Sequence, residues 1–94
     1  GGLFPSLDLA LLAQKHGLGY QLGCQVGETG ILSAAGRHFA CLVKNLLAIE
    51  GSYDQYLVRE RLTRSNISFE WRGIAPSLRG PGLGVEVDPD RLAR

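Results

Sequence analysis

Glu28 is the residue of this 94-residue chain whose position best suits chemistry. It follows a stretch that is typical of a buried strand ending near Cys24, and it stands just before a long apolar helix, where the helix dipole favours an anion. Gly23, Gly27 and Gly30 allow the intervening backbone to turn tightly. A carboxylate held at the carboxyl end of a strand by such a turn is how parallel α/β proteins present a functional group. The alternative is a charge that only stabilises the helix start.

The elements that must position this carboxylate form one unit. Residues 18–24 are predicted to be a strand, a helix runs from residue 28 or 29 to about 46, and residues 46–50 form a second strand. Strand, helix and strand over this length predict a βαβ unit with parallel strands. An amino-terminal helix over residues 3–16, capped by Gly17, precedes the unit. In the first strand one face carries Tyr20, Leu22 and Cys24, and the other carries Gln21, Gly23 and Gln25.

The long helix is predicted to bury one apolar stripe. Its members recur at helical spacing and are Ile31, Ala35, Phe39, Leu42 and Leu46. Ser33, Arg37 and Lys44 fall mostly outside this stripe, so we expect them to face away from the core.

The pattern changes in the second half of the chain. Residues 67–71 alternate apolar and polar side chains, which predicts a strand with Trp71 as a packing residue, and residues 84–87 read as a final short strand. Asp88, Pro89 and Asp90 predict the cap of a last helical turn. We therefore expect an α/β segment over residues 1–58 and a β-rich tail over 59–94. Two parallel strands alone leave both edges unpaired, which indicates part of a larger structure.

Other residues with reactive side chains have simpler structural explanations. Cys24 and Cys41 are too few for a disulfide framework or a zinc site, so both are predicted to be reduced core residues. His16 is expected to end a helix, and His38 to be partly buried. A catalytic histidine needs an orienting partner, and none is evident for either.

The charge distribution argues against polyanionic partners. The net charge is +1, which gives no electrostatic case for nucleic acid or a membrane surface. Arg59, Arg61 and Arg64 are interrupted by Glu60, which favours a solvated face over a phosphate site. The glycine-rich stretch 80–84 lacks the lysine of a phosphate-binding loop and is read as a turn.

Two stretches of the chain resemble the carboxyl-terminal portion of enolase-superfamily enzymes: GGLFPSLDLALLAQKHGLGYQLGCQVGETGILSAAGRHFA and GPGLGVEVDPDRL. The subgroup that they resemble contains muconate cycloisomerases (muconate lactonizing enzymes), o-succinylbenzoate synthases and dipeptide epimerases, which are similar to mandelate racemase. The resemblance implies a TIM-type (β/α) barrel in which residues 18–24 are the seventh strand and residues 46–50 the eighth. It also implies that the tail from about residue 59 returns to a capping domain.

The resemblance implies a reaction as well. Enzymes of this family remove a proton α to a carboxylate, and Mg²⁺ stabilises the enediolate that results. The family's metal carboxylates and base lysines lie on earlier barrel strands, which would precede Gly1. Lys15 and Lys44 are the only lysines here, and both are expected on helices. The chain is therefore expected to contain no catalytic or metal-binding residue, to be inactive alone, and to belong to a cytoplasmic enzyme that uses Mg²⁺.

The candidates that remain are substrate-pocket residues. Gln25 and Glu28 match the place where the family contacts substrate after the seventh strand. Dipeptide epimerases carry an Asp-x-Asp motif after the eighth strand, and this chain lacks it, so Glu50 or Asp54 would have to substitute. The expected partners are a small carboxylate substrate and, for the isolated chain, a second copy of itself. The alternative is a stand-alone α/β module that acts by binding or assembly.

Overall fold

The computed structural model describes residues 1–52 and 54–94, with the side chains of all of these except residues 54 and 55. Its elements, in chain order, are α1 (Leu3–Lys15), β1 (Tyr20–Leu22), α2 (Gly30–Leu42), β2 (Leu46–Ile49), α3 (Asp54–Leu57), the 3₁₀ turn η1 (Trp71–Gly73) and α4 (Pro89–Leu92).

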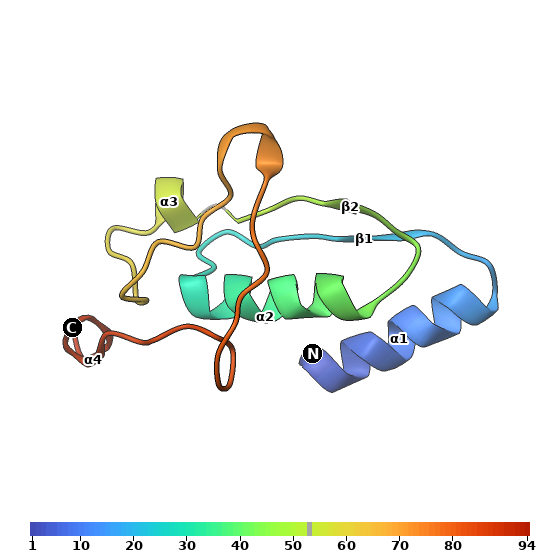
Figure 1. Ribbon diagram of the computed structural model, residues 1–94, viewed down its shortest axis with the longest axis horizontal. Coiled ribbons are helices and arrows are strands. Elements are labelled where there is room, and N and C mark those ends of the chain that lie inside the picture. The colour runs from blue at the N-terminus through green and yellow to red at the C-terminus, as the bar shows by residue number, and fades with distance from the viewer. Residues whose placement is uncertain (53) are drawn as a thin grey trace.

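The two strands pair in parallel, with α2 running beneath them (Figure 1). Tyr20 lies opposite Leu46 and Leu22 opposite Ile49, with a register shift after Tyr20. The predicted βαβ unit is therefore confirmed. Its strands are shorter than the sequence predicts, because regular pairing begins only at Tyr20.

Both long helices end through local backbone features. The α1 helix ends where Gly17 adopts a φ of +67° and the Leu18 N–H donates to the Ala13 carbonyl at 2.9 Å, as the predicted glycine cap requires. The α2 helix ends at Leu42, four residues before the predicted end, because Val43 is extended and Asn45 takes a φ of +62°. Asparagine tolerates this left-handed conformation better than most residues.

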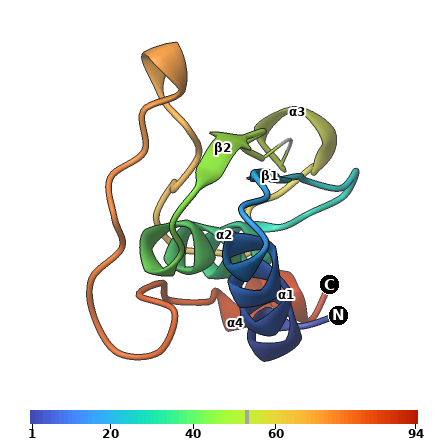
Figure 2. The ribbon, with the colours of Figure 1, turned by 90° about the vertical axis from the view of Figure 1, so that its right-hand side faces the viewer.

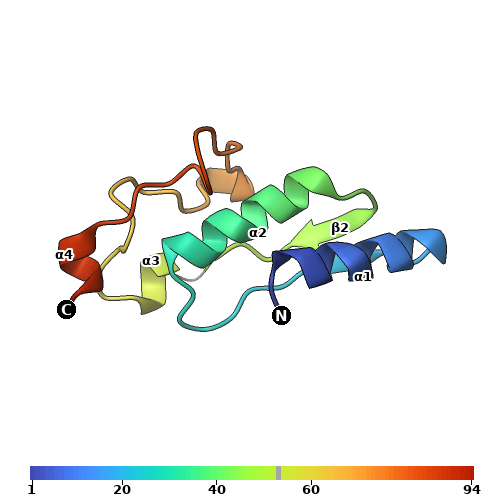
Figure 3. The same ribbon diagram turned by 90° about the horizontal axis from the view of Figure 1, so that it is seen from below.

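The tail over residues 59–94 wraps along one side of α2, and α1 lies along the other (Figures 2 and 3). The prediction that this tail is β-rich is wrong: within it, all of which the structure describes, β structure is limited to an antiparallel bridge between Thr63 and Val87. Residues 67–71 find no strand to pair with, and the Ile67 carbonyl instead accepts a hydrogen bond from Arg37. The predicted final turn is confirmed as α4, where the Asp88 side chain accepts from two backbone N–H groups.

The helix α2 is buried on two faces, whereas the sequence predicts one. Phe39 of the predicted stripe is buried, but so are Ser33 and Arg37, and Leu42 is exposed. The tail causes this difference, because it covers the face of α2 that carries Arg37. Thr63, only 1% exposed, packs against Gly30 at the start of α2, so closely that a Cβ there would lie 2.8 Å from its Oγ1.

Several apolar side chains remain outside this small core. Leu47 of β2 is 77% exposed and Trp71 is 84% exposed, so the predicted packing role of Trp71 is wrong. Cys41 is exposed as well, in contrast to its predicted place in the core. Within the described part of the chain the sheet has two strands, so each strand has one unpaired edge.

Candidate functional site

The candidate site lies where the two parallel strands end, at the same edge of the sheet. The Glu50 N–H donates to the Leu22 carbonyl at 3.0 Å, so the strand ladder extends one residue beyond β2. The chain leaves β1 as a loop over residues 23–29 that leads into α2, and it leaves β2 through Gly51 toward α3 (Figure 1). This geometry brings the carboxyl ends of both strands together.

Glu50 connects the two strand ends through its side chain. Its Oε2 accepts a hydrogen bond from the Cys24 backbone N–H at 3.1 Å, and its Oε1 accepts one from the Gln21 amide at 3.3 Å. The Glu50 carboxylate therefore accepts hydrogen bonds from β1 and from the residue just beyond it, at the point where backbone pairing between the strands stops.

Glu28 is held by the turn that it closes. Its N–H donates to the Gln25 carbonyl at 3.3 Å, and its Oε1 accepts the Gln25 N–H at 2.7 Å. Gly27 has a φ of +84°, which this turn requires at its third residue. The turn thus fixes the Glu28 carboxylate, which is half-buried, at the start of α2.

Cys24 lies next to both carboxylates. Its Sγ is 3.9 Å from the Glu50 Oε2. Partial burial raises the pKa of the Cys24 thiol, and the negative charges of Glu28 and Glu50 raise it further. The thiol is therefore neutral and weakly nucleophilic at physiological pH, which argues for a structural rather than a reactive cysteine.

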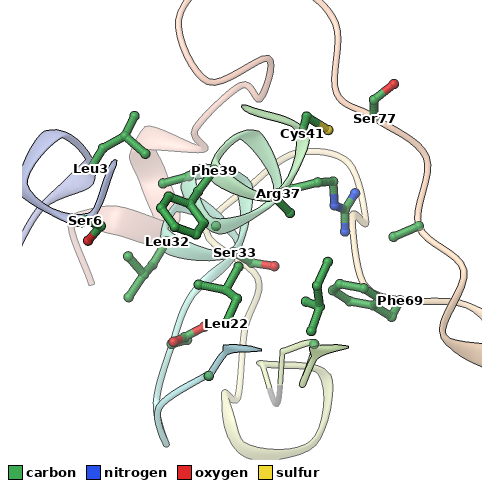
Figure 4. A pocket seen from close by; sticks show the side chains of 18 of the residues that line it. Leu3, Ser6, Leu22, Leu32, Ser33, Arg37, Phe39, Cys41, Phe69 and Ser77 are labelled. Atoms are coloured by element: carbon green, nitrogen blue, oxygen red, sulfur yellow. The ribbon is translucent and has the colours of Figure 1, made fainter. Parts of the chain in front are cut away.

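A largely apolar cavity of about 410 Å³ adjoins this edge, between the sheet, α2 and the tail (Figure 4). Glu28 is one of the residues that line it. Figure 4 shows Leu22 and Ser33 on one part of the wall and the Phe69 ring and the Arg37 side chain on another. The Arg37 guanidinium donates to the Ile67 carbonyl and, at 3.3 Å, to the Pro76 carbonyl. Its charge is thus directed toward the tail.

The structure brings three of the four sequence-predicted pocket residues to one place. Gln25 and Glu28 share the turn after β1, and Glu50 reaches that loop from the end of β2. Asp54 is the first residue of α3, and its side chain lies outside the described residues.

The sequence did not single out the contacts of Cys24 and Gln21 with Glu50. Only the parallel pairing of the strands could reveal them, because 29 residues separate Gln21 from Glu50.

The described side chains do not form a magnesium site by themselves. Among residues 1–52 and those that follow the gap, no three histidine, cysteine or acidic side chains converge as metal ligands would. Glu28 and Glu50 each already accept a backbone N–H, and Mg²⁺ needs six oxygen ligands in an octahedron. These two carboxylates alone therefore do not complete such a coordination shell.

The chain belongs to the enolase C-terminal domain-like family, whose profile matches residues 1–91. It is similar to the N-succinyl-L-Arg/Lys racemase of Bacillus cereus, with 30% identity over 95 aligned positions. The alignment covers 98% of this chain but 24% of the racemase, so the chain spans about a quarter of the length of that relative. No solved structure matches the chain. No helix in the described residues has the length and apolar character needed to cross a membrane.

Proposed function

We propose that this chain is the carboxyl-terminal part of an enolase-superfamily isomerase or lyase that removes a proton α to a carboxylate. The observation that carries the proposal is the placement of Glu28 and Glu50 at the carboxyl ends of adjacent parallel strands. The family match and the racemase relative support it. In this proposal β1 and β2 are the seventh and eighth strands of a (β/α) barrel, and the tail contacts a capping domain.

Other segments of the complete enzyme would supply the metal and the bases. We expect Mg²⁺ to stabilise the enediolate there, held by carboxylates outside this chain. Lys15 and Lys44 are exposed. Lys15 ends α1, and Lys44 lies next to Tyr20 at the start of β1, whereas Glu50 lies at the end of the strands, so neither lysine is placed to act as the base. The chain alone is therefore expected to be inactive. Its proposed contribution is Glu28, which lines the cavity, with Gln25 and Glu50 beside it at the strand ends.

The charges of this wall suggest a class of substrate. Glu28 and Glu50 place two negative charges around the Cys24–Gln25 segment, and no lysine or arginine forms an ion pair with either among the described side chains. A substrate group with a positive charge would complement them. The racemase relative acts on N-succinyl-L-Arg/Lys, and we propose N-acylated basic amino acids as the first substrates to test.

The test uses the complete enzyme with Mg²⁺ and N-succinyl-L-arginine in D₂O. The expected result is loss of optical activity together with deuterium incorporation at the α-carbon, because proton removal and return exchange that hydrogen. N-succinyl-L-alanine, which lacks the cationic side chain, is the matched control and should react more slowly. Absence of α-deuterium in both substrates, together with no conversion of muconate- and succinylbenzoate-type substrates, would rule out the proposed function.

A second candidate, a stand-alone binding module, is favoured by one observation. The tail packs on α2 within a single chain and covers the buried Arg37, which is 7% exposed. Against this, the unpaired strand edges and exposed Leu47 favour association with further strands. We propose that the isolated chain self-associates through these edges. Sedimentation of the isolated chain distinguishes the two, since a folded monomer would favour the module.

A further inference from the structure

Glu50 binds the exit of β1 through both its backbone and its side chain. Its N–H donates to the Leu22 carbonyl at 3.0 Å, and its carboxylate accepts the Cys24 N–H at 3.1 Å. The Glu50 Oε2 thus accepts the hydrogen bond that a backbone carbonyl would accept in a continuing strand, just after the last regular pair, Leu22 and Ile49. The Gln21 amide, on the same strand, donates to the second carboxylate oxygen at 3.3 Å.

The hydrogen bond from the Cys24 N–H to Glu50 also fixes the start of the turn that carries Glu28. Cys24 and Gln25 are consecutive, and their N–H groups donate to two different carboxylates, those of Glu50 and Glu28. The two consecutive peptide units on either side of the Cys24 Cα are therefore each held by a carboxylate, the first by Glu50 and the second by Glu28. Because only a short turn joins Cys24 to Glu28, the position of Glu28 relative to β2 depends on the hydrogen bond between Glu50 and Cys24.

We propose that Glu50 is a positioning residue, whose carboxylate fixes the start of the turn after β1 and so places the Glu28 carboxylate in the substrate pocket. The catalytic consequence rests on the proposed function of the complete enzyme, whereas the contact itself does not. Loss of the acceptor oxygen at this position would release the Cys24 N–H and let the turn move. Misplacement of a substrate-contacting group by about 1 Å can lower a rate by as much as ~100-fold.

The first experiment tests the contact between Glu50 and Cys24 without measuring enzyme activity. The pH dependence of Cys24 alkylation by iodoacetamide is followed by peptide mass spectrometry in the complete enzyme. Glu50 is one of the charges that raise the pKa of this thiol, so Glu50→Gln should shift the alkylation midpoint of Cys24 to lower pH. The control is Glu86→Gln, which removes an exposed carboxylate paired with Arg64 at 2.9 Å and should leave the midpoint unchanged.

The second experiment measures turnover by the same variants. Glu50→Asp keeps the charge but is one methylene shorter, so it should not reach the Cys24 N–H, and kcat should fall by about tenfold. Glu50→Gln keeps an oxygen that can accept this N–H, so its kcat should fall less than that of Glu50→Asp. A residue that only stabilises the fold would instead leave kcat per folded molecule unchanged in both variants.

The outcomes separate this proposal from the function on which it rests. A shifted midpoint in Glu50→Gln together with reduced kcat in Glu50→Asp supports it. An unchanged midpoint, or an undiminished kcat in Glu50→Asp, overturns it while leaving the proposed function intact. A shifted midpoint in an enzyme whose wild type shows no α-proton exchange overturns the catalytic role and the proposed function together, and leaves only a structural contact. If Glu50→Asp fails to fold, the alkylation midpoint of Cys24 in Glu50→Gln decides the test by itself.

Discussion

The guanidinium group of Arg37 lies over the ring of Phe69, with 5.2 Å between its central carbon and the ring centroid. Arg37 stands in the middle of α2 and Phe69 in the tail, so this contact joins two segments that are 32 residues apart in sequence. The Phe69 ring also packs on Gly51, within 3.4 Å of the position that a Cβ would take there. The tail is thereby held next to the end of β2 and next to the candidate site.

Replacing Arg37 should loosen the tail. Arg37→Met keeps much of the apolar stem but leaves the carbonyls of Ile67 and Pro76 without this donor. A buried acceptor that loses its partner costs about 1–3 kcal/mol, and the Ile67 carbonyl is such an acceptor, so the free energy of unfolding should fall by at least about 1 kcal/mol. Urea denaturation measures this change. Arg79→Met is the control, because Arg79 is exposed and its replacement should change stability by less than ~0.5 kcal/mol.

Alanine at two glycines of the same helix should have opposite effects. At Gly30, a Cβ would lie 2.8 Å from the Thr63 Oγ1, and Thr63 is fully buried, so Gly30→Ala should destabilise by about 1–3 kcal/mol. At Gly36, a Cβ would meet only the Leu22 Cδ2 at 3.5 Å, and Gly36→Ala should stabilise by about 0.5–1 kcal/mol through helix propensity. Thermal unfolding compares the two. An equal effect of both variants would contradict the close packing of Thr63 on Gly30.

The Cys24 thiol should make stability depend on pH at the alkaline end. Its pKa is raised above the ordinary value of 9.0, so the folded protein holds this proton more tightly than the unfolded chain. This contribution is complete below pH 9.0 and is lost as the pH rises through the higher pKa of the folded state. In the Cys24→Ser variant, the free energy of unfolding should therefore decrease less steeply above pH 9.0.

Glu28→Gln should alter substrate preference in the complete enzyme. If the Glu28 carboxylate faces a cationic side chain, its neutralisation should raise KM for N-succinyl-L-arginine about tenfold, which corresponds to ~1.4 kcal/mol. KM for N-succinyl-L-alanine should change little. Equal changes for both substrates, in steady-state kinetics, would instead place Glu28 away from the substrate side chain.

Local features of the sequence were sufficient to predict the order of the elements from α1 to β2, the final helical turn α4 and several of the ends of these elements. The apolar spacing of α1 and α2, the left-handed cap at Gly17 and the Asp88 cap depend on neighbours within a few residues. Interactions between residues this close in sequence form with the element itself and do not depend on the rest of the fold. The position of Glu28 between a strand and a helix was also predictable, because the glycines around it define the turn.

The tertiary structure alone decided which side chains meet. Arg37 is charged and lies outside the apolar stripe, yet it is buried because the tail supplies carbonyls and an aromatic ring for its guanidinium. Residues 67–71 have the alternation of a strand but remain unpaired, because a strand needs a partner backbone that no sequence pattern of its own can provide. For the same reason the contact between Glu50 and Cys24 could not be predicted, since it exists only when the two parallel strands align in this register.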